Sequence, residues 1–200
     1  MTYPKFFDKI PNIILKDELA CFLGAFEDGN IEFSYLDIVK SAGHSCPTVL
    51  GAYLMSLEGL KALYENEIPK RGEIVVEFKE AQNEGVAGVI GNVIMNITGA
   101  ATTNGFKGLN GKFDRNHLMK FEQNINGANV RFTRIDTLNS VDIFYNPNEI
   151  KPHEDMNFLM QKCMQGIATK DEVVEFGKLW QKRVEDISIN VDKVIKVKLL

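Results

Sequence analysis

Hydrophobic residues recur along the chain with two different periods, and these periods predict both helices and strands. From Asp17 to Phe26 and from Pro47 to Tyr64 they recur every three or four positions, as on one face of a helix. The first half of the second segment is apolar on nearly all sides, which predicts a largely buried helix. Further helices are expected at residues 85–98, 156–164 and 169–187, the last beginning with a capping box at Thr169 and Glu172.

Alternating apolar and polar residues, the period of a half-buried strand, mark several other segments. Because strands and helices do not strictly alternate, the order favours an α+β fold with a mixed β-sheet flanked by helices. We expect a core domain at residues 1–150, which includes an irregular N-terminal arm over 1–14. Residues 151–200 are expected to add helices and a terminal strand, packed on the core or on a partner subunit. The expected strands are 73–79, 112–121, 130–135, 141–145 and 187–199.

One short segment, Ser41 to Thr48, carries the residues most suited to chemistry. Pro47 favours the first position of a helix and keeps Cys46 extended, which predicts Cys46 as the helix N-cap. In an extended segment residues two apart point the same way, so His44 and Cys46 are expected to face one spot. The helix dipole and the unpaired N–H groups there favour a thiolate over a thiol.

Three interpretations of this pair stay open. An imidazole and a thiolate together suit zinc or a similar soft divalent metal. They also suit a nucleophile and its base, with Cys46 as the catalytic group and His44 beside it. The third interpretation is structural: a small buried cysteine next to a hydrogen-bonded histidine.

The segment Gly43 to Pro47 resembles the GHxCP motif of the FmdE-like family, which is named after a component of formylmethanofuran dehydrogenase. Two further segments resemble the family in matching order: 92–99 with the glycine-rich loop 102–113, and Met164 to Thr169 before a charged helix. The resemblance covers roughly residues 30 to 187. It implies a thioredoxin-like core within the α+β fold, a homodimer, and an association with formylmethanofuran oxidation.

The resemblance also implies site residues. Asn92, Thr98, Gly99 and Lys107 are the candidates for contacting a cofactor, Lys107 from the glycine-rich loop. Where the family usually has cysteine, aspartate and cysteine, this chain has Val89, Asn92 and Ala100, Thr48 replaces the usual glycine, and the paired cysteines of a C-terminal zinc finger are missing. Only His44 and Cys46 therefore carry over as metal ligands.

These residues lead to two main functional hypotheses. The first is a metal-binding accessory or redox-associated protein, with zinc or a similar divalent ion at an open site. A third ligand is needed there, and the candidates are His153, Glu154, water or a residue from a partner chain. The alternative is a protein that binds haem or another tetrapyrrole, with His44 or Cys46 as axial ligand. Whether the protein is an enzyme is left open.

Composition narrows the classes of partner. The net charge of −4 argues against a dedicated binder of nucleic acid or anionic membranes, and no apolar run is long enough to span a bilayer. Three widely spaced cysteines do not form a disulfide framework, and the first residues do not form a secretion signal. We therefore expect a cytoplasmic protein that binds a metal ion or small molecule and forms a homodimer.

Overall fold

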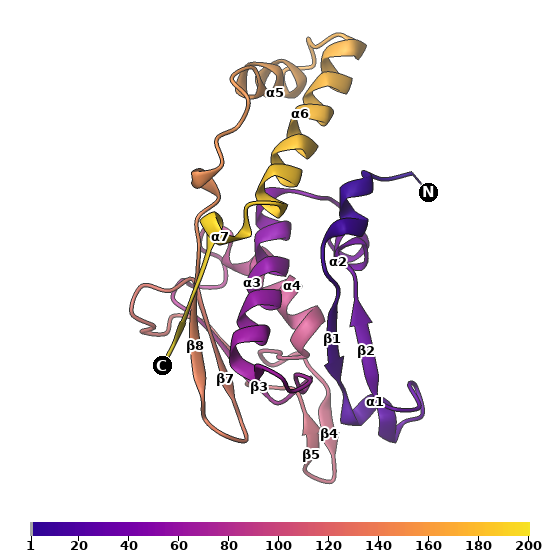
Figure 1. Cartoon of the computed structure of the whole chain (residues 1–200), viewed down its shortest axis with the longest axis vertical. Helices are drawn as coiled ribbons and strands as arrows, with labels where there is room; N and C mark the ends of the chain where they lie inside the picture. The colour runs from indigo at the N-terminus through magenta and orange to yellow at the C-terminus, as the bar shows by residue number, and fades with distance from the viewer. Residues whose placement is uncertain (1) are drawn as a thin grey trace.

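The computed structural model describes residues 2–200, which form an α+β fold around a mixed five-stranded sheet (Figure 1). The strand order is β6-β3-β7-β8-β9, in which β3 and β6 are parallel and the other neighbours are antiparallel. This confirms the predicted fold class; the thioredoxin-like core and the two-domain division stay predictions. The strands are β3 (Ile74–Phe78), β6 (Met119–Lys120), β7 (Val130–Arg134), β8 (Ser140–Tyr145) and β9 (Ile195–Leu199).

The central helix α3 (Pro47–Tyr64) lies on one face of this sheet, against β7, β8 and β9. Its sequence is apolar on most sides, and twelve of its residues are buried. Helix α4 (Ala87–Thr98) packs against α3, and its αL cap is Gly99. The predicted buried helix is thus confirmed, and it is the element against which both the sheet and α4 pack.

The N-terminal third surrounds this core. The 3-10 helix η1 (Lys5–Lys9) is followed by the antiparallel pair β1 (Ile13–Lys16) and β2 (Asn30–Phe33). Residues 13–14 were expected to be irregular, but they pair with β2 because the alternation of Ile13 and Leu15 buries one side of β1. The remaining elements here are α1 (Glu18–Phe22), α2 (Tyr35–Ala42) and the hairpin β4 (Lys107–Leu109) and β5 (Lys112–Asp114).

Two sequence predictions fail where a charged side chain is buried. The strand expected over 112–121 is interrupted between β5 and β6, because Arg115 turns inward and its guanidinium lies 2.7 Å from the Asp17 carboxylate. The helix expected from Asp17 to Phe26 is only α1, because Asp17 is its N-cap and accepts from the N–H groups of Leu19 and Ala20. Apolar periodicity alone does not reveal such long-range ion pairs.

The C-terminal quarter contributes an arm and the last strand. After η2 (Pro147–Glu149), α5 (Met156–Met164) and α6 (Lys170–Ser188) form a helical hairpin that extends away from the sheet (Figure 1). The predicted capping box at Thr169 is present. The strand predicted over 187–199 begins only at Ile195, because α6 continues to Ser188 and α7 (Val191–Val194) follows. Among residues 2–200, no helix is long and apolar enough to cross a membrane.

Candidate functional site

The His44 segment joins α2 to α3 and has the local geometry that its sequence predicts. Gly43 has a φ of 78° and ends α2 in the left-handed conformation. Cys46 is extended, with φ −150° and ψ 168°, and is the N-cap of α3. Its Sγ accepts a hydrogen bond from the Val49 N–H at 3.4 Å. Pro47 occupies the first turn of α3, as expected.

The His44 side chain is exposed and held in one orientation. Its Nδ1 lies 3.1 Å from the carbonyl oxygen of Ala42. A carbonyl oxygen can only accept, so Nδ1 carries the proton and the neutral ring keeps its lone pair at Nε2. This is the arrangement in which a histidine accepts a hydrogen bond from a ligand or coordinates a metal.

His44 lines a cavity of about 220 Å³ between α2 and α4. Ser41, Asn92 and Asn96 supply its other polar groups, and within residues 2–200 no carboxylate, lysine or arginine lines it. The Asn96 Nδ2 donates to the Ser41 Oγ at 2.7 Å, which links the two helices and leaves the Asn96 carbonyl oxygen free to accept. Apolar side chains complete the walls: Ile38, Ala42, Val89 and Val93.

Cys46 has different surroundings from His44. It does not line the α2–α4 cavity. Its thiol lies near the phenols of Tyr35 and Tyr145. Burial raises the pKa of both tyrosines well above the usual range, and the nearby Cys46 sulfur adds to the rise. The Tyr35 hydroxyl in turn lies 2.9 Å from the Ser45 Oγ.

Helix α6 and strand β8 hold the backbone of the His44 segment. The Trp180 Nε1 and the Gln181 Nε2 both donate to the Ser45 carbonyl oxygen, at 3.0 and 3.2 Å. The Tyr145 hydroxyl donates to the Pro47 carbonyl oxygen at 2.7 Å. The position of the His44 segment therefore depends on residues about one hundred or more positions later in the chain.

The other predicted cofactor contacts are dispersed. The Thr98 hydroxyl is buried and donates to the Ile94 carbonyl oxygen at 2.7 Å. Gly99 is the αL cap of α4, and Lys107 is exposed on β4. Of the four residues only Asn92 lines the cavity with His44. The sequence reasoning missed Asn96, although its place four residues after Asn92 on a helix puts both on one face.

The predicted metal ligands do not form a complete set in one chain. Among residues 2–200, no three His, Cys, Asp or Glu side chains gather as a metal site would require. His153 is exposed before α5, where its Nδ1 accepts from the Asp155 N–H at 3.3 Å. Zinc, a similar divalent metal and haem therefore stay predictions.

Comparison with known proteins gives one finding about structure and none about sequence. No protein-family model and no curated protein matches this chain. Among solved structures, the chain is similar to an FmdE-like protein of the tungsten formylmethanofuran dehydrogenase type from Syntrophus aciditrophicus. The two chains are 12% identical with a TM-score of 0.48, over 84% of this chain and 72% of that one. We draw no functional argument from a similarity of this size.

Proposed function

We propose that the protein binds a small polar ligand in the α2–α4 cavity, with the His44 Nε2 as the principal acceptor atom. The contact between the His44 Nδ1 and the Ala42 carbonyl oxygen carries this proposal, because it fixes the ring and leaves Nε2 free. Binding sites are typically concave and mostly apolar, with a few polar groups that set orientation. The cavity has this composition.

The lining indicates the kind of ligand. Drug-sized ligands usually occupy cavities of about 300–1,000 Å³. At about 220 Å³ this cavity suits a smaller molecule and is narrow for a tetrapyrrole. Because its polar groups are uncharged amides, a hydroxyl and an imidazole, it favours a neutral molecule that both donates and accepts hydrogen bonds. Small amides and alcohols are the simplest members of this class.

A metal ion is compatible with this site only in an open form. His44 would supply one nitrogen, and the remaining positions would come from water, the bound molecule or a partner chain. Cys46 would be the second protein ligand if its sulfur gave up the Val49 N–H, as the predicted His44–Cys46 pair requires. Such a metal would act as a Lewis acid toward the bound molecule.

NMR titration with small uncharged amides and alcohols, with and without Zn²⁺, tests the proposal. We expect shifts at the His44 ring and at the Asn92 and Asn96 amides, and their loss in His44→Ala. His117→Ala, at an exposed histidine away from this cavity, is the matched control and should bind as the wild type does. Ligands that shift other resonances but leave the His44 ring unchanged would contradict the proposed site.

Cobalt substitution separates the two metal hypotheses. If Cys46 is a ligand, Co²⁺ added to the protein will produce a thiolate-to-cobalt absorption band that Cys46→Ala abolishes. If His44 acts without Cys46, Co²⁺ will bind without this band and His44→Ala alone will prevent binding. Binding unaffected by either substitution would place the metal elsewhere and end the metal hypothesis.

We also propose that the protein forms a homodimer through the hairpin of α5 and α6. This hairpin exposes six large apolar side chains, whereas α5 buries only two, Met156 and Leu159. At the area that a large side chain offers, the six expose about 600 Å², close to the roughly 800 Å² per partner of a typical interface. The six are Phe158, Met160, Met164, Ile167, Val173 and Val174.

A second copy is the partner that fits this surface. Two antiparallel helices bury little between them, and pairing two identical hairpins completes a four-helix bundle. The only partner guaranteed to accompany each folded chain is another copy of it. The terminal strand β9 is not needed for this contact, because it already pairs with β8 of its own sheet.

A further inference from the structure

We propose that a groove beside the N-terminal segment binds an amphiphilic organic anion of the fatty-acid type. Its acidic head group would lie by Lys5 and Lys9, and its apolar chain between η1 and α2. This groove lies outside the His44 cavity, so the inference does not rest on the function proposed above.

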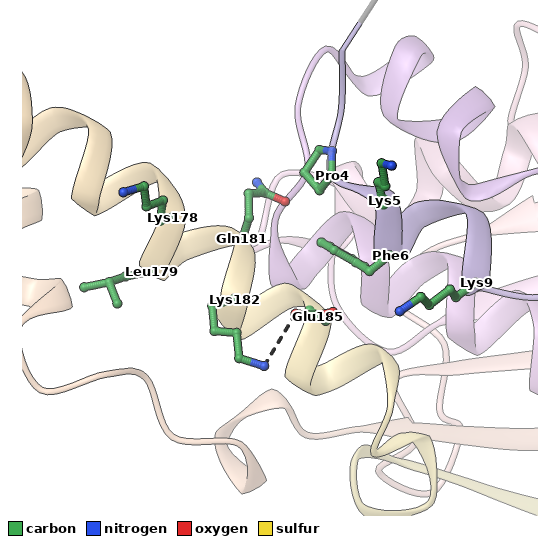
Figure 2. Close-up of a pocket in the computed structure, with 9 residues that line it drawn as sticks. All are labelled: Pro4, Lys5, Phe6, Lys9, Lys178, Leu179, Gln181, Lys182 and Glu185. Carbon is green, nitrogen blue, oxygen red and sulfur yellow. Dashed lines mark hydrogen bonds and ion pairs between the residues drawn. The ribbon is translucent and has the colours of Figure 1, made fainter.

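The first part of the groove is a cleft between η1 and α6 with a volume of about 530 Å³ (Figure 2). Phe6 of η1 and Pro4 give it an apolar wall. Figure 2 shows the Lys9 ammonium directed into the gap beside Phe6, and the Lys182 ammonium facing the same gap from α6. The cleft therefore combines an apolar surface with cations from two elements.

The second part is a neighbouring cavity of about 540 Å³ between the N-terminal segment and α2. Its walls are mainly apolar and include the side chains of Tyr3, Phe7, Leu36 and Val39. Pro4 and Gln181 line both cavities, so the two meet at that point. An elongated ligand can thus place its chain in one and its head group in the other.

The charges favour an anion. Five lysines line the two cavities, Lys5, Lys9, Lys40, Lys178 and Lys182, against one carboxylate, that of Glu185. The whole chain has the opposite balance, with 27 acidic and 23 basic residues. Lys40, Lys178 and Lys182 have carboxylate partners within 4 Å, while the ion pairs of residues 2–200 include neither Lys5 nor Lys9. These two ammonium groups are available to a ligand.

The combination of features selects the ligand class. A lysine ammonium binds a carboxylate or phosphate as a compact point charge. The apolar cavity contributes by removing a hydrocarbon chain from water, about 0.8 kcal/mol for each buried CH₂ group. A small hydrophilic anion would leave the apolar walls unused, and a neutral hydrocarbon would leave Lys5 and Lys9 without a partner.

Fluorescence titration with two dyes tests the proposal on the full chain. Anilinonaphthalene sulfonate is an aromatic anion, and N-phenyl-1-naphthylamine has similar rings without the charge. We expect Lys5→Gln/Lys9→Gln to weaken binding of the anionic dye about ten-fold and to leave the neutral dye unchanged. We expect Val39→Trp, which fills the apolar cavity, to weaken binding of both dyes.

The matched control removes two exposed lysines from β9 with Lys196→Gln/Lys198→Gln, which should leave both dyes unchanged. Circular dichroism would verify that every variant is folded. Equal binding of the anionic dye by the wild type and both groove variants would overturn the proposal.

Competition distinguishes a free amphiphile from a lipid surface. Dodecanoate, added below its micelle concentration, should displace the anionic dye from the wild type. Displacement by phosphatidylglycerol vesicles but not by dodecanoate would overturn the proposal and indicate a membrane surface instead.

Discussion

At the scale of single residues, the most constrained side chain is Asp17. Its carboxylate is buried, caps α1, and pairs with Arg71 at 2.8 Å and Arg115 at 2.7 Å. Arg71 also donates to the carbonyl oxygens of Asn96 and Ile97 at the end of α4. One carboxylate therefore links α1, α4 and the segment before β6, and it offsets two guanidinium groups.

We expect Asp17→Ala to lower the free energy of unfolding by about 3–5 kcal/mol, because removing one partner leaves buried charge unpaired. Urea denaturation measures this change. Asp28→Ala, at a more exposed aspartate in the turn before β2, is the control and should cost far less. A similar loss in both variants would show that the buried network contributes little.

The same group gives a pH dependence. Burial raises the pKa of Asp17, but the hydrogen bond from Arg71 and the charge of Arg115 outweigh it and hold the pKa below its usual 3.8. A carboxyl with a lowered pKa stabilises the fold above its unfolded value and loses that contribution as pH falls through the folded value. We therefore expect the stability difference between wild type and Asp17→Asn to be full at neutral pH and to shrink below about pH 4.

The residue scale also shows what the sequence could supply. The cap of α3 was predictable because Pro47 constrains Cys46 and itself by local sterics. The partners of His44 were not predictable, because Asn96 reaches Ser41 from 55 positions away. Local rules fix a segment's conformation, whereas the neighbours of that segment depend on the packing of the whole chain.

At the scale of elements, the close approach of β8 to α3 depends on a glycine. A Cβ on Gly51 would lie 2.2 Å from the ring of Tyr145, whose hydroxyl reaches the Pro47 carbonyl oxygen. The two elements can pack in this way only if position 51 has no side chain. The sequence marked Gly51 as part of a buried helix but contained no sign of the strand that crosses it.

We expect Gly51→Ala to destabilise the protein by about 1–3 kcal/mol, as overpacking does, despite the higher helix propensity of alanine. Gly177→Ala in α6 is the matched control. A Cβ there meets nothing within 4 Å, so this variant should be more stable by about 0.5–1 kcal/mol. Thermal denaturation measures both, and stabilisation by both substitutions would contradict the packing described for Tyr145.

At the scale of the whole molecule, the chain has a well-packed core and one extended arm (Figure 1). Pattern analysis predicted the mixed sheet and the helices because most of them bury one face in this core. It located β9 poorly, because the residues between α6 and β9 also alternate in hydrophobicity. The arm was predicted as two helices, but its isolation from the sheet is a tertiary feature that periodicity does not report.

We expect Met164→Glu/Ile167→Glu to convert a dimer into a monomer, because both side chains belong to the exposed apolar surface of the arm. Light scattering after size-exclusion chromatography gives the mass. Leu138→Glu, at a 75% exposed leucine in the turn between β7 and β8, is the control and should keep the mass of the wild type. A monomeric wild type would refute the dimer.

The bonds from Trp180 and Gln181 to the Ser45 carbonyl oxygen have a consequence for biosynthesis. A ribosome releases residues 41–48 long before it has translated α6. During that interval the nascent His44 segment lacks the two donors that will later fix it. The binding cavity is therefore finished only when the last quarter of the polypeptide has emerged, and a chain stalled before codon 180 would carry the motif without its final shape.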